Sequence, residues 1–196
     1  MKTIAYYFSV LSPFTYFAGD RLERIAARHG VAIEYLPMDI MGLFGKTGGV
    51  PPKDRHVSRQ NYRIQEIQRI AKHSGMSVNL KPKFWPTDPK PASFSIINAP
   101  NEQGDKGQLV RNYLTACWAE DRDIADPSVV QDCLKAAGFG PAEIAEADNT
   151  RAIKIFQQNT QRAEEDHVFG SPTYVIDGQV FWGQDRLEYL DWFLRE

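Results

Sequence analysis

Segments with strand patterns occur only near the two ends of this chain, and the stretch between them is patterned for helices. Residues 2–8 and 31–39 are apolar runs rich in β-branched and aromatic types, which is typical of buried strands. Residues 13–29 lie between them and predict a helix, with Pro13 in its first turn and Gly30 at its end. This order predicts two parallel strands joined by a right-handed crossover.

The middle of the chain predicts helices and two irregular segments. Residues 41–54 are rich in Gly and Pro, and we expect a loop there. Residues 80–91 hold four prolines, which exclude regular structure. The predicted helices cover residues 57–75, 91–100, 107–123, 126–138, 140–147 and 149–167.

The C-terminal end returns to strands. Asp177-Gly178 separates the apolar runs 173–176 and 179–182, which is a strong hairpin signal, and 186–194 predicts an amphipathic helix. The assembled order is β-α-β, a long helical stretch, then α-β-β-α. It predicts an α/β protein with a thioredoxin-like fold that carries an inserted all-helical domain. We expect residues 1–40 plus 150–196 to form the thioredoxin-like domain and residues 41–149 the insertion.

The length and net charge of the chain limit the number of domains and the kinds of molecule that it is expected to bind. A chain of 196 residues suits one domain, or one domain with an insertion. Its formal net charge of −2, without a basic block, argues against nucleic acid or an anionic membrane as partner. The apolar N-terminal run is interrupted by Tyr6, Tyr7 and Ser9 and lacks the features of a signal peptide, so we expect a cytoplasmic protein with no membrane span.

The chain has two cysteines, Cys117 and Cys133. We expect both to be buried, reduced thiols, with a disulfide as the alternative. There is no Cys-x-x-Cys motif, and no Cys/His group has zinc-ligand spacing, so we predict neither a redox dithiol nor a bound metal.

Ser12 precedes Pro13 where the first predicted strand meets the first predicted helix. A serine at this place is most often a helix N-cap. It is also a place from which many enzymes present a reactive group. In thioredoxin-like proteins the active group at the start of the first helix faces a loop with a cis-proline before the third strand. Here that loop would be 169–176, with Pro172 as the candidate cis residue.

With these two motifs in place, the chain resembles the bacterial 2-hydroxychromene-2-carboxylate isomerases, which group with the kappa-class glutathione transferases in the DsbA-like branch of the thioredoxin fold. The resemblance covers essentially the whole chain. It is carried by "FSVLSPFTYFA" at 8–18, "GGVPP" at 48–52 and "FGSPTYVIDGQVFWGQDRLEYL" at 169–190.

The family has a serine where the related oxidoreductases carry a nucleophilic cysteine, and Ser12 occupies that place, with Thr15 at the second position. A hydroxyl cannot form a mixed disulfide, so the site cannot exchange disulfides. The resemblance implies that it binds the thiol of glutathione instead. A free thiol with a pKa near 8.5 is only about 3% thiolate at pH 7. A helix N-terminus and a Ser12 hydroxyl would both stabilise the anion.

The resemblance further implies reversible addition of this thiolate to an aryl enone acid from aromatic catabolism, such as naphthalene degradation. Addition turns a double bond into a single bond, the bond rotates, and the thiolate leaves, so glutathione is a cofactor. The relatives also suggest a homodimer.

The remaining site residues follow from the resemblance by position. It implies that Ser171 pairs its backbone with glutathione and that Gln184 and Asp185 clamp the γ-glutamyl group at the start of the last helix. The glutathione site would comprise Ser12, Ser171, Pro172, Gln184, Asp185 and Arg59. The substrate site would comprise Lys46, Trp85 and Gly49.

At some of these positions the residue differs from the one common in the family, and at others the residue also has an ordinary structural explanation. Gly49 stands where many members have Asn, so one polar contact to glutathione is lost or comes from Lys53. Gln184 replaces a commoner Asn or Ser, and Arg59 a frequent Lys. Ordinary roles remain open for several residues: N-cap for Asp185, solvated surface for Lys46 and Arg59, and core for Trp85.

Three functions are therefore compared. The first is a glutathione-dependent isomerase with Ser12 as the catalytic residue. The second is a kappa-like glutathione transferase or peroxidase with the same site. The third is a non-catalytic thioredoxin-fold binding module that has lost its cysteines.

Overall fold

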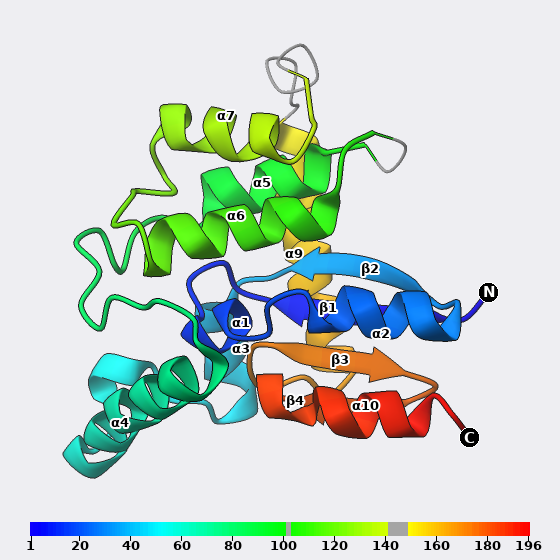
Figure 1. The fold of residues 1–196 in the computed structure, drawn as a ribbon, viewed down its shortest axis with the longest axis horizontal. Helices are drawn as coiled ribbons and strands as arrows, with labels where there is room; N and C mark the ends of the chain where they lie inside the picture. The colour runs from blue at the N-terminus through cyan, green and yellow to red at the C-terminus, as the bar shows by residue number, and fades with distance from the viewer. Residues whose placement is uncertain (101–102, 141–148) are drawn as a thin grey trace.

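The computed structural model describes residues 1–100, 103–140 and 149–196, and its centre is one four-stranded sheet (Figure 1). The strands are β1 (Thr3–Phe8), β2 (Ala32–Pro37), β3 (Thr173–Ile176) and β4 (Gln179–Trp182), in the order β2-β1-β3-β4. β1 and β2 are parallel, whereas β3 is antiparallel to β1 and to β4. The two ends of the chain thus meet in one sheet, which confirms the predicted thioredoxin-like α/β fold.

The helices surround this sheet on both faces. They are α1 (Pro13–Tyr16), α2 (Arg21–His29), α3 (Ile40–Thr47), α4 (Val57–Ser74), α5 (Lys90–Asn98), α6 (Lys106–Trp118), α7 (Pro127–Ala136), α9 (Asn149–Glu165) and α10 (Leu187–Phe193). The described residues also form two 3₁₀ turns, η1 (Pro52–Asp54) and η2 (Gln184–Arg186). The helix predicted over 140–147 falls on residues 141–148, outside the described part of the chain.

Alternate residues of β1 belong to two separate cores, as expected for a strand covered on both faces. Ile4, Tyr6 and Phe8 belong to the larger core, which includes buried residues of α2, α6, α7 and α10. Ala5 and Tyr7 belong to a smaller core with buried residues of α3 and α9. In Figure 1, α9 accordingly lies behind the sheet, and α2 and α10 lie in front of it.

The single helix predicted over 13–29 is wrong, because the chain breaks it into α1 and α2. Gly19 adopts a positive φ of 61°, a conformation that glycine tolerates and that ends the first helical segment. Asp20 then stands at the N-cap position of α2. The consequence for the site is that α1 has only four residues.

The loop predicted over 41–54 is also wrong at its start, where α3 forms. Asp39 caps α3, since its Oδ1 accepts hydrogen bonds from the Met41 and Gly42 amides, both at 3.1 Å. Leu43 is fully buried in the smaller core. The cap and this burial together outweigh the low helix propensity of the glycines. Other predicted elements are present with shifted ends; α6, for example, stops at Trp118 instead of residue 123.

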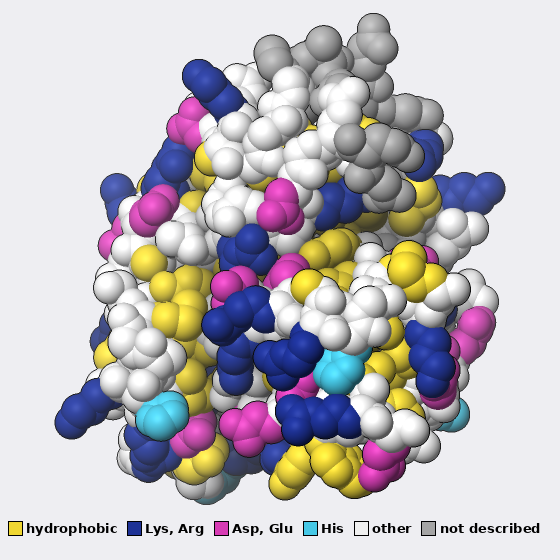
Figure 2. All heavy atoms as spheres, turned by 45° about the vertical axis from the view of Figure 1, so that its right-hand side comes forward, with side chains coloured by type: hydrophobic (Ala, Val, Ile, Leu, Met, Phe, Trp, Pro, Cys, Tyr) yellow, Lys and Arg dark blue, Asp and Glu magenta, His cyan; other side chains and the backbone are white. Residues whose placement is uncertain are grey.

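The surface mixes charges of both signs. On the face shown in Figure 2, lysine and arginine side chains lie among aspartate and glutamate side chains. Near the C-terminus, for example, Asp191 pairs with Arg28 at 2.8 Å and with His29 at 2.9 Å. Within the described residues, no helix has the length and apolar character needed to cross a bilayer.

Candidate functional site

Ser12 lies between β1 and α1 and connects two segments that are distant in sequence. As the N-cap of α1, its Oγ accepts a hydrogen bond from the Thr15 amide at 3.2 Å. The same hydroxyl donates to the carbonyl of Ser171 at 3.1 Å. The predicted capping role is confirmed, and the second bond places Ser12 directly against the loop that precedes β3.

That loop has the predicted geometry, because the Ser171-Pro172 peptide bond is cis. The Ser171 hydroxyl accepts a hydrogen bond from the Ser9 amide at 2.8 Å and shares another with the Thr15 hydroxyl at 2.9 Å. Thr15 is only 1% exposed, so this contact is internal to the site wall. The side chain of Ser171 is therefore held in place from two sides.

Ser9 and Thr15 were not among the predicted site residues. Thr15 could have been found, since it stands at the second position of the absent Cys-x-x-Cys motif, where a side chain faces the same loop. Ser9 carries no such signal, because it contributes through its backbone amide. Both act on Ser171 and so are positioning residues.

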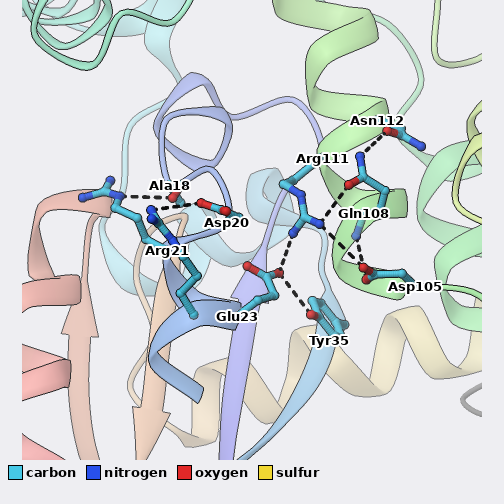
Figure 3. Close-up of polar contacts among 10 residues, drawn as sticks. Ala18, Asp20, Arg21, Glu23, Tyr35, Asp105, Gln108, Arg111 and Asn112 are labelled. Atoms are coloured by element: carbon cyan, nitrogen blue, oxygen red, sulfur yellow. Dashed lines mark hydrogen bonds and ion pairs between the residues drawn. The ribbon is translucent and has the colours of Figure 1, made fainter. Parts of the chain in front are cut away.

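The turn η2 joins the same site through its first residues. The Gly183 amide donates to the Pro172 carbonyl at 2.9 Å. Gln184 accepts a hydrogen bond from Arg21, whose guanidinium also binds the carbonyls of Phe17 and Ala18 at the end of α1. Figure 3 shows Arg21 reaching Ala18. Arg21, which sequence reasoning missed, thus ties η2 to α1.

Gln184 and Asp185 do not begin the last helix as predicted. They belong to η2, and the N-cap position of α10 is Arg186. The reason is Gly183, whose φ of 112° turns the chain before the helix can start. Asp185 is largely exposed and pairs with Arg186 at 3.2 Å.

Trp85 lies next to Ser12 in space although it is far away in sequence. Its indole Nε1 donates to the carbonyl of Leu11, the residue before Ser12, at 3.0 Å. Its ring packs against Trp118 with 5.6 Å between ring centroids. The half-buried Trp85 therefore forms a wall beside the Ser12 backbone.

Among the described residues, no contact joins Lys46, Arg59 or Gly49 to these groups, and each lies in a different environment. Lys46 lies on α3 and pairs with Glu164 of α9 at 2.5 Å, at a groove between α3, α5 and α9. Arg59 is exposed on the first turns of α4. Gly49 lies under the ring of Phe44, where a β-carbon would come within 2.2 Å of Cδ1. The Asn common in the family would therefore clash here unless Phe44 moved.

The chain's own thiols are unsuited to chemistry. Cys117 and Cys133 are free and buried, as predicted. Burial raises the pKa of each thiol to about 12, so both are protonated at neutral pH. Within the described residues, no group of three or more His, Cys, Asp or Glu side chains is placed to hold a metal ion.

Two unused hydrogen-bond donors flank the Ser12 hydroxyl. Among the described residues, nothing accepts a hydrogen bond from the backbone amides of Phe14 and Ser171. Unpaired backbone donors at a helix start suit an anion, and an unpaired amide beside a carbonyl in an extended loop suits another peptide.

Comparison with known proteins agrees with this geometry. Residues 3–195 match the family model described as DSBA-like thioredoxin domain. The 2-hydroxychromene-2-carboxylate isomerase of Sphingobium xenophagum is 27% identical over 195 residues, covering 98% of both chains. Glutathione S-transferase kappa 1 of Caenorhabditis elegans is 24% identical and covers 97% of this chain and 89% of its own.

A solved structure of 2-hydroxychromene-2-carboxylate isomerase shares the fold, with a TM-score of 0.75, 23% identity and coverage of 98% of this chain and 94% of its own. The resemblance stated from the sequence motifs is confirmed by these matches. The chain belongs to the DSBA-like thioredoxin domain family.

Proposed function

We propose that this protein is a glutathione-dependent cis-trans isomerase that acts on an aromatic acid such as 2-hydroxychromene-2-carboxylate. The observation that carries the proposal is the Ser12 hydroxyl, held at 3.1 Å from the Ser171 carbonyl where the thiol enzymes of this fold have cysteine. Relatives named as isomerases at 25–27% identity support the reaction class. Glutathione, when bound, would supply a thiolate that adds reversibly to the conjugated double bond and lets it rotate.

The residues at the Ser12 site fit a glutathione cysteinyl group. The amide and carbonyl of Ser171 could pair with its backbone in the manner of an added strand. The Ser12 hydroxyl and the Phe14 amide could both donate to its sulfur. Because α1 has only four residues, its dipole contributes little, and these two hydrogen bonds must provide most of the stabilisation.

Ser12 has one proton to donate, and in this structure the Ser171 carbonyl receives it. A cysteinyl amide that donates to the same carbonyl would compete with the hydroxyl for it. The hydroxyl could then turn toward the sulfur while its oxygen still accepts from the Thr15 amide. Occupation of the Ser171 backbone would thereby activate Ser12.

The test is calorimetry with glutathione, followed by the ultraviolet absorbance of bound thiolate and an isomerase assay. We expect Ser12→Ala to lose the thiolate signal at pH 7 and about a hundredfold in rate, whereas Ser12→Thr keeps the cap and the hydroxyl and retains most of both. Absence of glutathione binding to the wild-type protein at millimolar concentration would refute the proposal.

A kappa-like transferase is the second candidate, since kappa-class relatives match nearly the whole chain. It would use the same residues but consume glutathione, so measuring free thiol during turnover separates it from an isomerase. A binding module without activity would instead tolerate Ser12→Ala in every small-molecule assay.

Several finer expectations remain predictions. We propose a cytoplasmic homodimer that binds a small aromatic substrate, and a division into residues 1–40 plus 150–196 and the insertion 41–149. The roles of Gln184 and Asp185 at the γ-glutamyl group, and of Lys46, Gly49 and Arg59, are proposed on the family resemblance. Size-exclusion chromatography with light scattering measures the oligomeric state directly.

A further inference from the structure

Arg63 on α4 is a half-buried cation that has no anionic partner in the part of the chain that the structure describes. Its guanidinium carbon lies 5.3 Å from the ring centroid of Trp85 and 6.0 Å from that of Trp118. In the described part of the chain, no carboxylate forms an ion pair with Arg63, and its guanidinium has no hydrogen-bond acceptor. The guanidinium instead lies over two indole rings.

The Arg63 guanidinium keeps part of its surface open to solvent, so a ligand can reach it. It has five N–H donors, and none of them has a protein acceptor among the described residues. Burial, with a smaller effect from Arg55, lowers the pKa of Arg63 to about 10, so it remains charged at neutral pH. A charge kept under these conditions suits a ligand that brings the missing anion.

A second unmet donor lies beside Arg63. The indole Nε1 of Trp118 is buried and has no acceptor among the described residues. The equivalent atom of Trp85, by contrast, donates to Leu11 next to Ser12. Trp85 therefore contacts Arg63 and Trp118 on one side and the backbone beside Ser12 on the other. The donors of Arg63 and Trp118 that lack acceptors are linked in this way to the Ser12 site.

The neighbouring charges on this part of the chain are also positive. Arg59 lies one helical turn before Arg63 on α4, and Arg55 binds the Val50 carbonyl at 2.7 Å. The nearest acid along the helix, Glu66, is already paired with Arg69 at 2.7 Å. The local field thus favours an anion at Arg63.

We propose that Arg63, Trp85 and Trp118 form a subsite that binds an aromatic carboxylic acid beside Ser12. The carboxylate takes hydrogen bonds from the Arg63 guanidinium in a bidentate manner, and the aromatic body packs on Trp85. Its link to catalysis rests on the isomerase proposal above, but the binding itself does not.

The same carboxylate chemistry occurs in glutathione, whose glycine end is also anionic. The half-buried ring of Trp85 favours the aromatic acid, since it offers a stacking surface that a glycine carboxylate does not need. Lys46, the other cation predicted for the substrate, is already engaged by Glu164. Arg63 is therefore the residue that we assign to the substrate's charge.

The experiment compares cinnamate with its neutral analogue cinnamamide by calorimetry, without glutathione. We expect the wild-type protein to prefer the acid by about tenfold or more. Arg63→Gln should lose this preference, and Arg63→Lys should keep part of it. Arg69→Gln is the matched control, because it removes the same charge from an exposed position of α4 and should leave the preference intact.

Two results would overturn the subsite. One is equal affinity of the wild-type protein for the acid and the amide. The other is a preference that survives in Arg63→Gln, whose folding is checked by its melting temperature; if that variant does not fold, Arg63→Met removes the same charge and gives the same comparison. A loss of glutathione affinity in Arg63→Gln, with the cinnamate preference unchanged, would assign Arg63 to glutathione instead.

These outcomes are separate from a failure of the proposed function. If the wild-type protein did not bind glutathione, the isomerase would be refuted, while the cinnamate titration would still decide the subsite. If glutathione bound normally and the protein did not prefer cinnamate over cinnamamide, only the proposed subsite would be refuted.

Discussion

Arg111 and Arg63 are both partly buried arginines, but only Arg111 has carboxylate partners among the described residues. Arg111 on α6 lies 3.3 Å from Glu23 of α2 and 3.7 Å from Asp105, and it donates to Gln108 at 3.0 Å. Figure 3 shows these side chains converging between α2, β2 and α6. Arg63 has two indole rings and no carboxylate within the described residues.

The difference indicates two uses of a buried cation. Tyr35 of β2 donates to Glu23 at 3.1 Å, so the Arg111 cluster joins three elements and acts on stability. Arg63 contacts no charged partner in residues 1–100, 103–140 and 149–196, so its contribution should appear in binding. This difference can be tested by measuring the free energy of unfolding and the ligand affinity separately in variants of the two arginines.

The largest effect is expected for Arg111→Met. This change leaves the Glu23 carboxylate enclosed without its cation, and breaking a fully buried pair costs about 3 to 5 kcal/mol. Because the two side chains keep 21% and 25% exposure, we expect a loss of about 2 kcal/mol in the free energy of unfolding. Urea denaturation measures it, and a loss below about 0.5 kcal/mol would show that the cluster does not hold the elements together.

Gly107→Ala tests how tightly the same cluster is packed. A β-carbon at Gly107 would lie 2.5 Å from Glu23 Oε1 and 2.7 Å from the Tyr35 hydroxyl, so the cluster must shift. Overpacking of this kind destabilises by about 1 to 3 kcal/mol, and we expect the lower end.

Gly45→Ala is the control for this change. Gly45 lies inside α3 with nothing within 4 Å of its added β-carbon, so the same substitution should stabilise by about 0.5 kcal/mol. Opposite signs in the two variants support the packing argument, and equal signs contradict it.

The pH dependence of stability should reveal Glu23. Burial raises its pKa above the usual 4.5, although Arg111 and Tyr35 act in the opposite direction. The folded state then binds the proton more tightly than the unfolded state, so Glu23 makes stability fall as pH rises from about 4.5 through the folded pKa. Glu23→Gln should remove this fall, and so its stability relative to wild type should increase with pH across that window.

Denaturation curves between pH 4 and 7 would measure this trend. A Glu23→Gln curve parallel to the wild-type curve would mean that the carboxyl titrates normally. We expect the change to be smaller than the loss in Arg111→Met, since only one proton is involved.

The smallest stability effect is expected for Arg63→Met, the direct counterpart of Arg111→Met. Removing an unpaired, partly buried charge relieves its desolvation but gives up the contact with the indoles, which is worth about 0.5 to 2 kcal/mol. We expect a change within about 0.5 kcal/mol of wild type in urea denaturation. A loss as large as that of Arg111→Met would make Arg63 a structural residue and would remove the comparison.

Much of the fold followed from the sequence because its signals are local. The strand patterns, the Asp177-Gly178 hairpin and the order of elements predicted the sheet that β1 to β4 form. The errors were local as well: the break at Gly19 and the capped start of α3 depend on single residues whose backbone or packing the periodicity does not report. At the site, the pairing of Ser12 with the Pro172 loop was predicted. Ser9, which acts through its backbone amide, and Arg21, whose guanidinium binds backbone carbonyls, were missed.

The sequence by itself determined which groups the protein has at the start of its first helix: a serine, no cysteine, and a Ser-Pro loop to face it. Only the tertiary structure decided which charges are matched. Arg59, Arg63 and Arg69 look alike in the helical pattern of α4, yet Arg63 alone lies over two indoles. The free energy of a charge depends on the solvent it loses and the partners it gains, and segments distant in sequence supply both.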